Sequence, residues 1–482
     1  MPTQAQPLVL VPFIDGVADT PSSSGAQIAL VSPNRGETYA LMLDTPAGQV
    51  HAAVASAQRA YLAHRRVALA QRAAWLNAAA AALEAAVPEL VEMLIADIGK
   101  PRRAAQFEAQ RSAAFLRMTA AQVLVLGGET VPVDAAANGA GRVGFTRRVP
   151  YGVVAAVTPF NAPINLLVQK VGPALAVGNA VVVKPHPTGT RIALRVAALF
   201  AQAGLPAGLF NVVTGDREPA RLLVSDPNVA AVTFTGGTLA GDALVRAAGA
   251  KKFVAELGSN AANIVLADAD VADAAKRIAS AAFEASGQQC ISAQRVIVEA
   301  PVYEAFLAAF VNAARALRVG EATDDTTDVG PMISSAAADR VMGMIAEAIA
   351  QGGRYALEPT RRYCIVSPGI VVDVPRRAQM WCDEAFGPVA IVERAASVDE
   401  ALALANDSPF GLQGALFTAS LASAMRFSEE FDVGSLWVNE ASRFRLDMYP
   451  FGGVKRSGFG REGVRYALEE MSQLKFTGIR FQ

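Results

Sequence analysis

The sequence predicts an α/β protein with two parallel-sheet units and an extended β-arm. Between residues 152 and 257, short and almost continuously apolar segments alternate with stretches of helical periodicity. The same alternation resumes after residue 262, and two strand-like segments stand outside both runs. Apolar strands separated by helices are typical of a parallel sheet that is covered on both faces. A chain of 482 residues is also too long for one core, so more than one domain is expected.

The first part of the chain is predicted to contain strands and turns followed by helices. Short strands joined by tight turns are expected around 13–16 and 32–36. From about 49 to 125, alanine and leucine recur at helical spacing. Pro88 and Pro101 stand where helices are expected to begin, because proline is favoured in a first helical turn.

Five strands of the first parallel sheet are predicted in order. They lie at 153–157, 180–183, 209–213, 230–235 and 253–257. Such sheets bind ligands beyond the carboxyl ends of their strands. The loops at those ends contain Asn161, Lys184, Gly215 and Gly236, which makes them candidate binding residues.

The second run begins with a strand predicted at 263–266. Asp268 and Asp270 are expected to cap a helix that continues into Glu284. A strand at 295–298 and a helix from Pro301 follow, and the pattern continues to Phe417 in the same manner.

Two further segments, 142–149 and 473–480, alternate like strands but belong to neither run. We interpret the first as an extended arm and the second as an exposed terminal strand. Such segments can complete the sheet of a neighbouring subunit, which predicts a homo-oligomer.

Composition excludes several classes of function. The net charge is −1 without blocks of like charge, so no nucleic-acid partner is expected. The N-terminus lacks the pattern of a signal peptide, and no apolar run reaches the length of a membrane span. Three widely spaced cysteines fit neither a disulfide framework nor a zinc site, and they favour a reduced cytoplasmic location. Only three histidines occur, which argues against a histidine-based metal site or a Ser-His-Asp triad.

Cys290 is the candidate nucleophile. Most cysteines are small buried hydrophobes, and this interpretation is kept for Cys364 and Cys382. Cys290 differs because it follows Gly287 at a predicted helix exit and has polar neighbours. An activated thiol can form and release a covalent acyl intermediate.

Glu256 and Asn161 are the candidate partners of that thiol. Glu256 ends a predicted strand, where partial burial would raise its pKa toward that of a general base. The alternative is a salt-bridged surface glutamate. Asn161 can donate its amide to an oxyanion, or it can simply form an Asx turn between two prolines.

A glycine-containing turn at 234–241 is the candidate phosphate site. A strand there leads into a helix, whose N-terminus favours an anion. The turn lacks the G-x-G-x-x-G pattern, so alone it is a weak dinucleotide signal. Lys184 can bond a ribose or phosphate, or it can be a surface lysine at a strand end.

Together these features resemble the aldehyde dehydrogenase superfamily. Seven motifs occur in that family's order and at its usual separations between residues 152 and 465. They are Thr-Pro-Phe-Asn-Ala-Pro at 158–163, Lys-Pro at 184–185, Phe-Thr-Gly-Gly at 234–237, Glu-Leu-Gly at 256–258, Gly-Gln-Gln-Cys at 287–290, Glu-Ala-Phe-Gly-Pro at 384–388 and Pro-Phe-Gly-Gly at 450–453. The overall pattern is similar to the branch that acts on lactaldehyde, glyceraldehyde 3-phosphate and phosphonoacetaldehyde.

The resemblance implies a mechanism. Cys290 would attack the aldehyde, Asn161 and the Cys290 backbone N–H would hold the oxyanion, and Glu256 would activate water to release the acid. Lys170 and Glu462 would relay the proton outward. The implied cofactor is NAD or NADP, held by Thr158, Pro159, Phe160, Lys184, Pro187, Gly215, Thr235, Gly236, Gly237, Gly241, Leu257, Gly258, Glu384 and Phe386.

The resemblance also implies a domain division. Residues 1–126 and 148–257 would form a Rossmann-like NAD(P)-binding domain, with a boundary near Gly258. Residues 258–468 would form an α/β catalytic domain. Residues 127–147 and 469–482 would form a bridging β-arm that assembles a homodimer or homotetramer.

Three positions depart from the family pattern. Pro187 replaces a frequent acidic residue that holds the adenosine ribose, so no carboxylate repels a 2′-phosphate and both NADP and NAD are candidate cofactors. Gly237 replaces a serine near the pyrophosphate. Ser259 replaces a glycine, which we expect to be tolerated.

The predicted substrate is a small polar or anionic aldehyde. Arg443 and Arg445 lie in the segment matching the family's substrate-mouth loop, and Arg111 lies on the helix that lines the substrate tunnel in the family. Arginine pairs can grip carboxylate, sulfonate, phosphonate or phosphate groups. Beside the nucleophile, Gln289 and Ile291 complete the predicted substrate residues.

Arg443 and Arg445 have an alternative interpretation as surface partners of Glu440 and Asp447 that never touch substrate. Rival functions are oxidation of a neutral aliphatic or aromatic aldehyde, a CoA-acylating semialdehyde dehydrogenase, a non-catalytic protein that keeps the fold, and a pyridoxal-phosphate enzyme. Glu256 argues against CoA as the acyl acceptor, and the complete set of Cys290, Glu256 and Asn161 argues against a non-catalytic protein.

Overall fold

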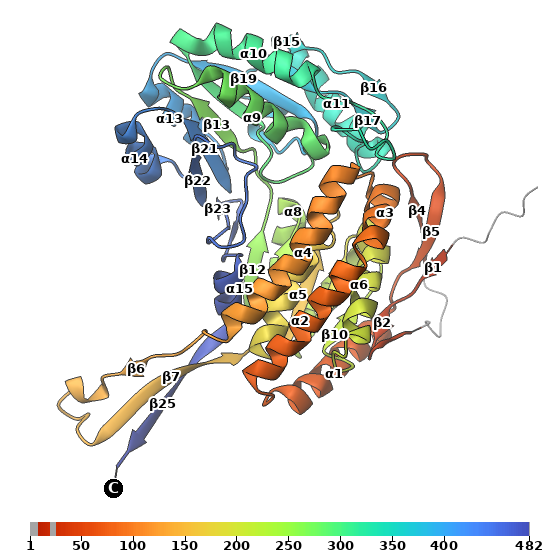
Figure 1. Ribbon diagram of the computed structural model, residues 1–482, viewed down its shortest axis with the longest axis vertical. Helices are drawn as coiled ribbons and strands as arrows, with labels where there is room; N and C mark the ends of the chain where they lie inside the picture. Colours follow the sequence, from red (N-terminus) through yellow and green to blue (C-terminus); the bar gives the residue numbers. More distant parts are fainter. Residues whose placement is uncertain (1–7, 20–25, 482) are drawn as a thin grey trace, which may run out of the picture.

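The computed structural model describes residues 8–19 and 26–481. It contains two lobes, each built on a large sheet, and a narrow arm that leaves the lower lobe (Figure 1). The lower lobe contains an eight-stranded sheet and most of the first half of the chain. The upper lobe contains a seven-stranded sheet from the second half.

The first sheet has the strand order β24-β12-β11-β8-β9-β10-β2-β3. Its strands are β2 (Phe13–Ile14), β3 (Val17–Ala18), β8 (Val153–Thr158), β9 (Ala180–Pro185), β10 (Phe210–Val212), β11 (Val229–Thr235), β12 (Lys252–Glu256) and β24 (Gly458–Phe459). The five central strands pair in parallel, as predicted. Every residue of β8 and β9 is buried, because helices cover both faces of the sheet.

The direction of the crossovers decides which helices cover each face. The helices are α1 (Ala47–His64), α2 (Leu69–Ala85), α3 (Val87–Ile98), α4 (Arg102–Val123), α5 (Asn165–Val177), α6 (Thr190–Gln202), α7 (Arg217–Ser225) and α8 (Thr238–Ala248). Since β-α-β crossovers are right-handed, α5 and α6 share one face while α7 and α8 share the other. Helix α1 contacts α7, and α2 and α4 contact α5 as an outer layer.

The second sheet has the order β15-β18-β19-β14-β13-β21-β22. Its strands are β13 (Ala262–Val265), β14 (Arg295–Glu299), β15 (Arg354–Leu357), β18 (Gly369–Val372), β19 (Val389–Ala395), β21 (Gln413–Phe417) and β22 (Ser435–Val438). Its helices are α9 (Val271–Phe283), α10 (Tyr303–Arg315), α11 (Ser335–Ala350), α12 (Gln379–Cys382), α13 (Val398–Asn406) and α14 (Leu421–Glu430). One apolar cluster contains residues of α9 and α10, and a second contains residues of α11 and α13. This sheet is therefore also covered on both faces.

The chain returns to the first lobe near its end. Strand β24 pairs with β12, and α15 (Val464–Glu470) contacts α4 and α5. The remaining strands are β1 (Leu8–Leu10), β4 (Gln27–Val31), β5 (Thr38–Leu43), β16 (Arg361–Arg362), β17 (Ile365–Val366), β20 (Phe410–Gly411) and β23 (Val454–Lys455). Both lobes therefore contribute to the region where β12 ends.

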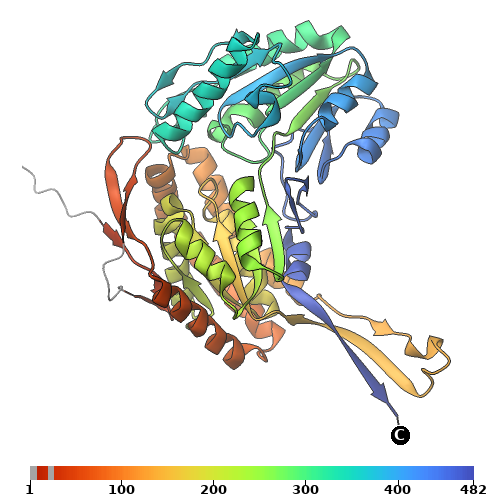
Figure 2. The same ribbon diagram turned by 180° about the vertical axis from the view of Figure 1, so that it is seen from behind.

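The two strand-like segments predicted outside the sheets pair with each other. Strand β7 (Arg142–Pro150) lies between β6 (Thr130–Val131) and β25 (Ser472–Arg480). The register runs from Pro150 opposite Ser472 to Arg142 opposite Arg480. Figure 2 shows the resulting ribbon projecting from the body. Leu474, Phe476 and Ile479 are exposed along it.

Most predicted elements are confirmed. Asp270 caps α9 by accepting the N–H of Asp273 at 3.0 Å. The predicted cap at Asp268 is wrong, because its carboxylate instead accepts the hydroxyl of Thr418 at 2.8 Å and connects the segment before α9 to the end of β21.

Among the described residues, every helix is too short or too polar to cross a bilayer. Within the same residues, no cluster of three His, Cys, Asp or Glu side chains is arranged to hold a metal ion.

Candidate active site

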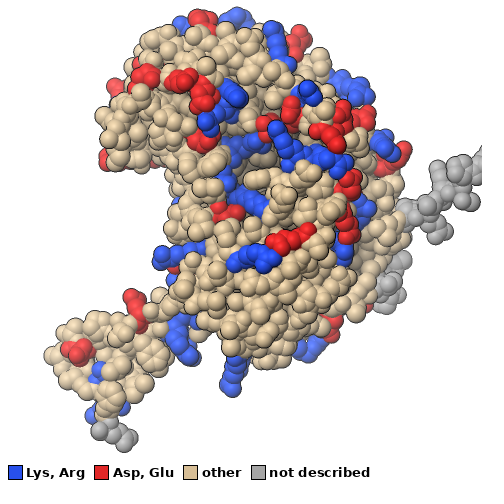
Figure 3. All heavy atoms as spheres, viewed as in Figure 1, with Lys and Arg blue, Asp and Glu red and all other residues tan. Residues whose placement is uncertain are grey.

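A cavity of about 1670 Å³ lies where the carboxyl ends of the first sheet face the second lobe. On the face seen in Figure 3, Lys and Arg side chains gather around the hollow between the lobes. The predicted site residues that line the cavity are Arg111, Thr158, Pro159, Phe160, Asn161, Lys184, Pro187, Thr235, Gly236, Gly237, Glu256, Leu257, Gly258, Gln289, Cys290, Ile291, Glu384, Phe386, Arg443, Arg445 and Glu462. The other three, Lys170, Gly215 and Gly241, are buried behind this lining.

The turn before Cys290 has a strained backbone. Helix α9 ends at Phe283, and the following Ala285 and Ser286 have φ values of 54° and 57°. Left-handed conformations cost about 1–2 kcal/mol for residues with a Cβ, so the surroundings must hold the turn in place. The Ser286 hydroxyl does so by donating to the Gly330 carbonyl at 2.7 Å. Gly287 continues the turn with φ 62°, and a Cβ there would collide with the carbonyl of Gly387.

Cys290 is half-buried at the end of this turn. It packs against an apolar cluster of Ile291, Leu412 and Phe451. Burial raises the pKa of the Cys290 thiol to about 12, and Glu384 adds to the rise, whereas Arg445 opposes it. Attack on a carbonyl needs the thiolate, so the charges around Cys290 decide its reactivity.

Glu256 is the last residue of β12, and pairing within the sheet fixes its position. It lies opposite Thr235 of β11 and is 2% exposed. Neither carboxylate oxygen has a hydrogen-bond partner among the described residues. Burial, and then the charge of Glu462, raise the pKa of Glu256 well above its usual value. A buried carboxyl group of this kind is suited to general-base catalysis near neutral pH.

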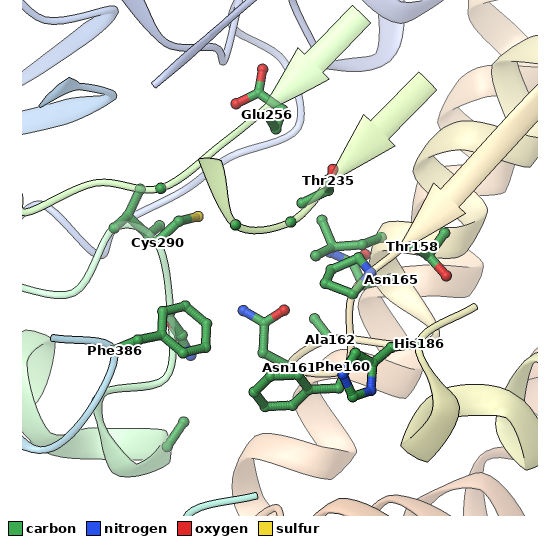
Figure 4. A pocket seen from close by; sticks show the side chains of 18 of the residues that line it. Thr158, Phe160, Asn161, Ala162, Asn165, His186, Thr235, Glu256, Cys290 and Phe386 are labelled. Carbon is green, nitrogen blue, oxygen red and sulfur yellow. The ribbon is translucent and has the colours of Figure 1, made fainter. Parts of the chain in front are cut away.

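Asn161 faces the same space from the loop after β8. In Figure 4, Cys290, Glu256 and Asn161 surround one opening, with the sulfur directed toward the turn after β11. One N–H of the Asn161 amide donates to the Gln288 carbonyl at 3.0 Å. That bond fixes the amide beside the Cys290 loop and leaves its second N–H for a ligand oxygen.

The turn after β11 has the features of a phosphate site. Gly237 is the N-cap of α8, and a Cβ built there would meet nothing within 4 Å. Helix N-termini with open approach bind phosphate groups well. The hydroxyls of Thr158 and Thr235 are buried without a partner among the described residues. Lys184 is 5% exposed, and burial lowers its pKa to about 8 against the opposing charges of Asp216 and Asp44.

Glu384 and Phe386 reach the cavity from the second lobe. Glu384 Oε1 accepts the backbone N–H of Ser259 at 2.9 Å. A Cβ at Gly258 would lie 2.9 Å from Glu384 Oε2, so a larger residue there would displace the Glu384 carboxylate. Burial raises the pKa of Glu384 to about 7. The ring of Phe386 meets that of Phe160 edge-on with centroids 5.8 Å apart, which joins the two lobes across the opening.

The predicted arginines line the cavity, and each is fixed by a carboxylate. Arg111 donates to Asp447, and Arg443 donates to Glu284 at 2.6 Å. Arg445 donates through Nη2 to Glu462 at 2.8 Å. The alternative prediction, in which Arg443 and Arg445 pair with Glu440 and Asp447, is wrong. Glu440 pairs with Arg277, and Asp447 pairs with Arg111.

Lys170 and Glu462 are in direct contact. Lys170 Nζ donates to Glu462 Oε1 at 2.9 Å and to the Thr233 hydroxyl at 3.2 Å. Although burial acts in the opposite direction, Lys170 and Arg445 together lower the pKa of Glu462 to about 2. Both oxygens of Glu462 are therefore held by cations, which favour its ionised form.

A buried ion pair beside Asn161 was missed from the sequence. Lys100 and Glu108 pair with exposures of only 8% and 4%. Glu108 Oε1 also accepts the backbone N–H groups of Ile164 at 2.9 Å and Asn165 at 3.2 Å, where α5 begins. The available signal was the position of Glu108, which is the one charged residue among the buried residues of α4.

The whole chain is similar in sequence and structure to known proteins. The model of the aldehyde dehydrogenase family matches residues 20–477. A 3-sulfolactaldehyde dehydrogenase from Priestia aryabhattai is 42% identical over 386 residues, which cover 80% of this chain and 81% of that protein.

Two solved structures have nearly the same fold. An NADP-dependent glyceraldehyde-3-phosphate dehydrogenase from Bacillus halodurans, solved with NADP, superposes with a TM-score of 0.95 at 32% identity and covers 98% of this chain and 99% of that one. Aldehyde dehydrogenase 21 from Physcomitrella patens, solved with the reaction product succinate, gives a TM-score of 0.94 at 31% identity, with 99% of each chain covered.

Proposed function

The chain belongs to the aldehyde dehydrogenase family and is an NAD(P)-dependent aldehyde dehydrogenase, and we propose that its substrates are small aldehydes carrying a sulfonate, phosphonate, phosphate or carboxylate group. The observation that carries the substrate class is the placement of Arg111 and Arg443 on the wall of the cavity that contains Cys290. Guanidinium groups recognise such anions through paired, charge-assisted hydrogen bonds.

The two arginines remain able to bind a ligand. Arg111 is 17% exposed and uses Nε and Nη2 for Asp447, so Nη1 is left for the cavity. Arg443 is 24% exposed and uses Nη2 for Glu284 and Ser280. The similar proteins support this class, since their names or bound product include a sulfonate, a phosphate and a dicarboxylate.

The proposed reaction begins at Cys290. Its thiolate forms a bond to the aldehyde carbon, and the carbonyl electron pair moves to oxygen, where Asn161 and the Cys290 backbone N–H stabilise the charge. The nicotinamide, when bound, supplies the acceptor for the hydride that leaves that carbon. Cys290 then carries a thioester. Glu256 takes a proton from water as the water oxygen attacks, and the acid leaves as the thiolate is restored.

The residues on the first lobe fit the cofactor. The open backbone at Gly237 and the two unpartnered threonine hydroxyls suit a pyrophosphate or ribose. Lys184 lines this half of the cavity and can bond a ribose or phosphate, and Pro187 brings no carboxylate to oppose a 2′-phosphate. We therefore assign NAD or NADP to this half of the cavity, with Glu384 and Phe386 holding the nicotinamide end.

The arm supports a proposed homodimer or homotetramer. Strand β25 leaves one edge unpaired in the described part of the chain and exposes Leu474, Phe476 and Ile479. Such an edge is suited to pairing with another subunit.

We propose that residues 1–126 and 148–257 bind the cofactor, 258–468 bind the aldehyde, and 127–147 with 469–482 form the arm. The three free cysteines support a cytoplasmic location.

The test is a panel of short aldehydes matched in length, neutral, carboxylated, phosphorylated and sulfonated, each assayed with NAD and with NADP. We expect kcat/KM for at least one anionic aldehyde to exceed that of its neutral counterpart by about 100-fold or more. Equal values across the panel would refute the anionic class. Acyl-CoA formation is measured in parallel, because a CoA-dependent product would refute hydrolysis by Glu256.

A further inference from the structure

A carboxylate lies on the cavity wall where α9 leads into the turn that carries Cys290. Glu284 is the C-cap of α9, and its side chain is 21% exposed. The carboxyl end of a helix carries a partial negative charge, so an acidic side chain is unfavourable there. The helix itself therefore gains nothing from a glutamate at this position.

Three neighbouring side chains fix the Glu284 carboxylate. The Ser280 hydroxyl donates to Oε1 at 2.7 Å, and Arg103 Nη2 lies 3.3 Å from the same oxygen. Arg443 Nη2 donates to Oε2 at 2.6 Å. The carboxylate is thus held beside one of the two arginines assigned to the substrate anion.

Arg443 has further N–H groups for a ligand. In the described part of the chain it donates only through Nη2, to Glu284 and to the Ser280 hydroxyl at 3.4 Å. The N–H groups of Nε and Nη1 remain, and the side chain is 24% exposed at the cavity. A substrate anion bound to them shares one guanidinium with the Glu284 carboxylate. The two negative groups then repel each other across Arg443.

The other cations on this side of the cavity have carboxylate partners of their own. This side is lined by α4, the turn before it, α9, the segment 440–446 and Glu462. The pairs are Lys100 with Glu108, Arg103 with Asp328, Arg111 with Asp447, Arg277 with Asp273 and Glu440, and Arg445 with Glu462. Lys170 and Arg461 do not line the cavity and lie next to Glu462 and Glu256. Among the described residues that line this side, a second negative charge on a ligand therefore meets no cation without a carboxylate partner.

We propose that Glu284 is a specificity-determining residue, which makes the enzyme favour aldehydes with a singly charged sulfonate or carboxylate over those with a doubly charged phosphate or phosphonate. The attractive contacts with Arg111 and Arg443 are similar for all four groups. Repulsion from Glu284 acts once on a single charge and twice on a double charge. Discrimination between similar ligands commonly uses such a repulsive element. The inference rests on the proposed anionic substrate class and narrows it.

A merely structural role of Glu284 has a different signature. Its contact with Arg443 also holds the loop that carries Arg443 against α9. Loss of that contact alone would change kcat/KM for neutral and charged aldehydes by a common factor. Selection by charge instead changes each value according to the charge of the aldehyde, so a comparison of substrates separates the two roles.

The test compares sulfoacetaldehyde with phosphonoacetaldehyde and uses neutral propionaldehyde as the reference. The two charged aldehydes have the same length and a tetrahedral anionic group. The sulfonate carries one negative charge throughout, whereas a phosphoryl group gains its second negative charge at about pH 6. The ratio of kcat/KM for phosphonoacetaldehyde to that for sulfoacetaldehyde should therefore fall in the wild-type enzyme between about pH 5.5 and 8.5.

Glu284→Gln removes the charge and keeps the size of the side chain. At pH 8 it should raise kcat/KM about fivefold for sulfoacetaldehyde and about 25-fold for phosphonoacetaldehyde, and leave propionaldehyde within about twofold. The ratio then rises about fivefold, and its fall with pH becomes smaller by the same factor. Glu284→Asp keeps the charge and should keep the wild-type ratio. Asp273→Asn is the matched control, because it removes a negative charge from α9 outside the cavity lining and should leave the ratio unchanged.

An unchanged ratio in Glu284→Gln would overturn the proposal, as would a wild-type ratio that does not fall with rising pH. A common change for all three aldehydes would show that Glu284 only holds the loop. Because the ratio compares two substrates on one preparation, partial unfolding of a variant does not alter it. Failure of the proposed function is seen separately, as equal use of sulfoacetaldehyde and propionaldehyde by the wild-type enzyme.

Discussion

Arg111 on α4 and Asp447 in the loop before β23 form a two-point ion pair, with Nε 3.0 Å from Oδ2 and Nη2 2.6 Å from Oδ1. Asp447 is 7% exposed, and it also accepts a hydrogen bond from Gln169 on α5 at 3.2 Å. The loop that carries Arg443 and Arg445 is therefore tied to two helices of the first lobe. The orientation of Arg111 is set before any substrate arrives, which lowers the entropy cost of binding an anion.

Arg111→Gln is expected to lower kcat/KM for a sulfonated or phosphorylated aldehyde about 10- to 100-fold, because a charged hydrogen bond to the ligand is lost. The change should appear mainly in KM and should be less than about threefold for a neutral aldehyde of the same length. Arg443→Ala should have an effect of the same kind. Equal losses for charged and neutral aldehydes would mean that these arginines support the fold instead of binding substrate.

Cys290→Ala is expected to abolish aldehyde oxidation, since no covalent intermediate can form. Glu256→Gln should slow steady-state turnover about 100-fold or more while a rapid first turnover of reduced cofactor remains, because only the hydrolysis step needs the base. Stopped-flow absorbance measures the burst. Full steady-state turnover in Glu256→Gln would remove Glu256 from the mechanism.

The parts of the site that lie within short motifs could be predicted from the sequence. Cys290 follows a glycine turn, Glu256 ends a strand, and Asn161 stands in a loop after a strand, so each is recognisable from its neighbours. The partners of Arg445 could not be found in this way. Glu462 is 17 residues away and Gln169 is 276 residues away, and only the packing of two lobes brings them together.

The pH dependence of stability is expected to change in Glu384→Gln. The pKa of Glu384 is raised to about 7, so between its unfolded value near 4.5 and about 7 the folded protein binds more protons than the unfolded chain. Its contribution to stability is therefore present at low pH and is lost as pH rises through 7. Replacing it with glutamine should reduce the fall in Tm of the cofactor-free enzyme between pH 5 and 7.5 by about 2 °C or more. Identical slopes would show that Glu384 titrates normally.

Glu108→Gln is expected to lower the free energy of unfolding by about 3 kcal/mol, because Lys100 would be left buried without its partner. The Glu108 carboxylate accepts the backbone N–H of Ile164 where the loop that carries Asn161 leads into α5. Because the substitution weakens this contact and loosens the Asn161 loop, kcat should fall as well. Denaturant unfolding and steady-state kinetics measure the two effects. Glu89→Gln is the control, because Glu89 pairs with Arg195 at 48% exposure and should cost less than about 0.5 kcal/mol. Equal destabilisation by both substitutions would contradict a special role of the buried Lys100–Glu108 pair in stability.

Pro187→Glu is expected to shift cofactor use toward NAD. Pro187 begins a short 3-10 turn (Pro187–Gly189) at the cavity wall, and Lys184 lies near it at the end of β9. A carboxylate at this position would repel a 2′-phosphate and accept hydrogen bonds from the ribose hydroxyls of NAD. The ratio of kcat/KM for NADP to that for NAD should fall by about tenfold or more, mostly through KM for NADP. Lys184→Met should weaken both cofactors, because Lys184 faces the shared ribose region. A ratio unchanged by Pro187→Glu would place the adenosine ribose away from this turn and would leave Lys184 without the assigned role.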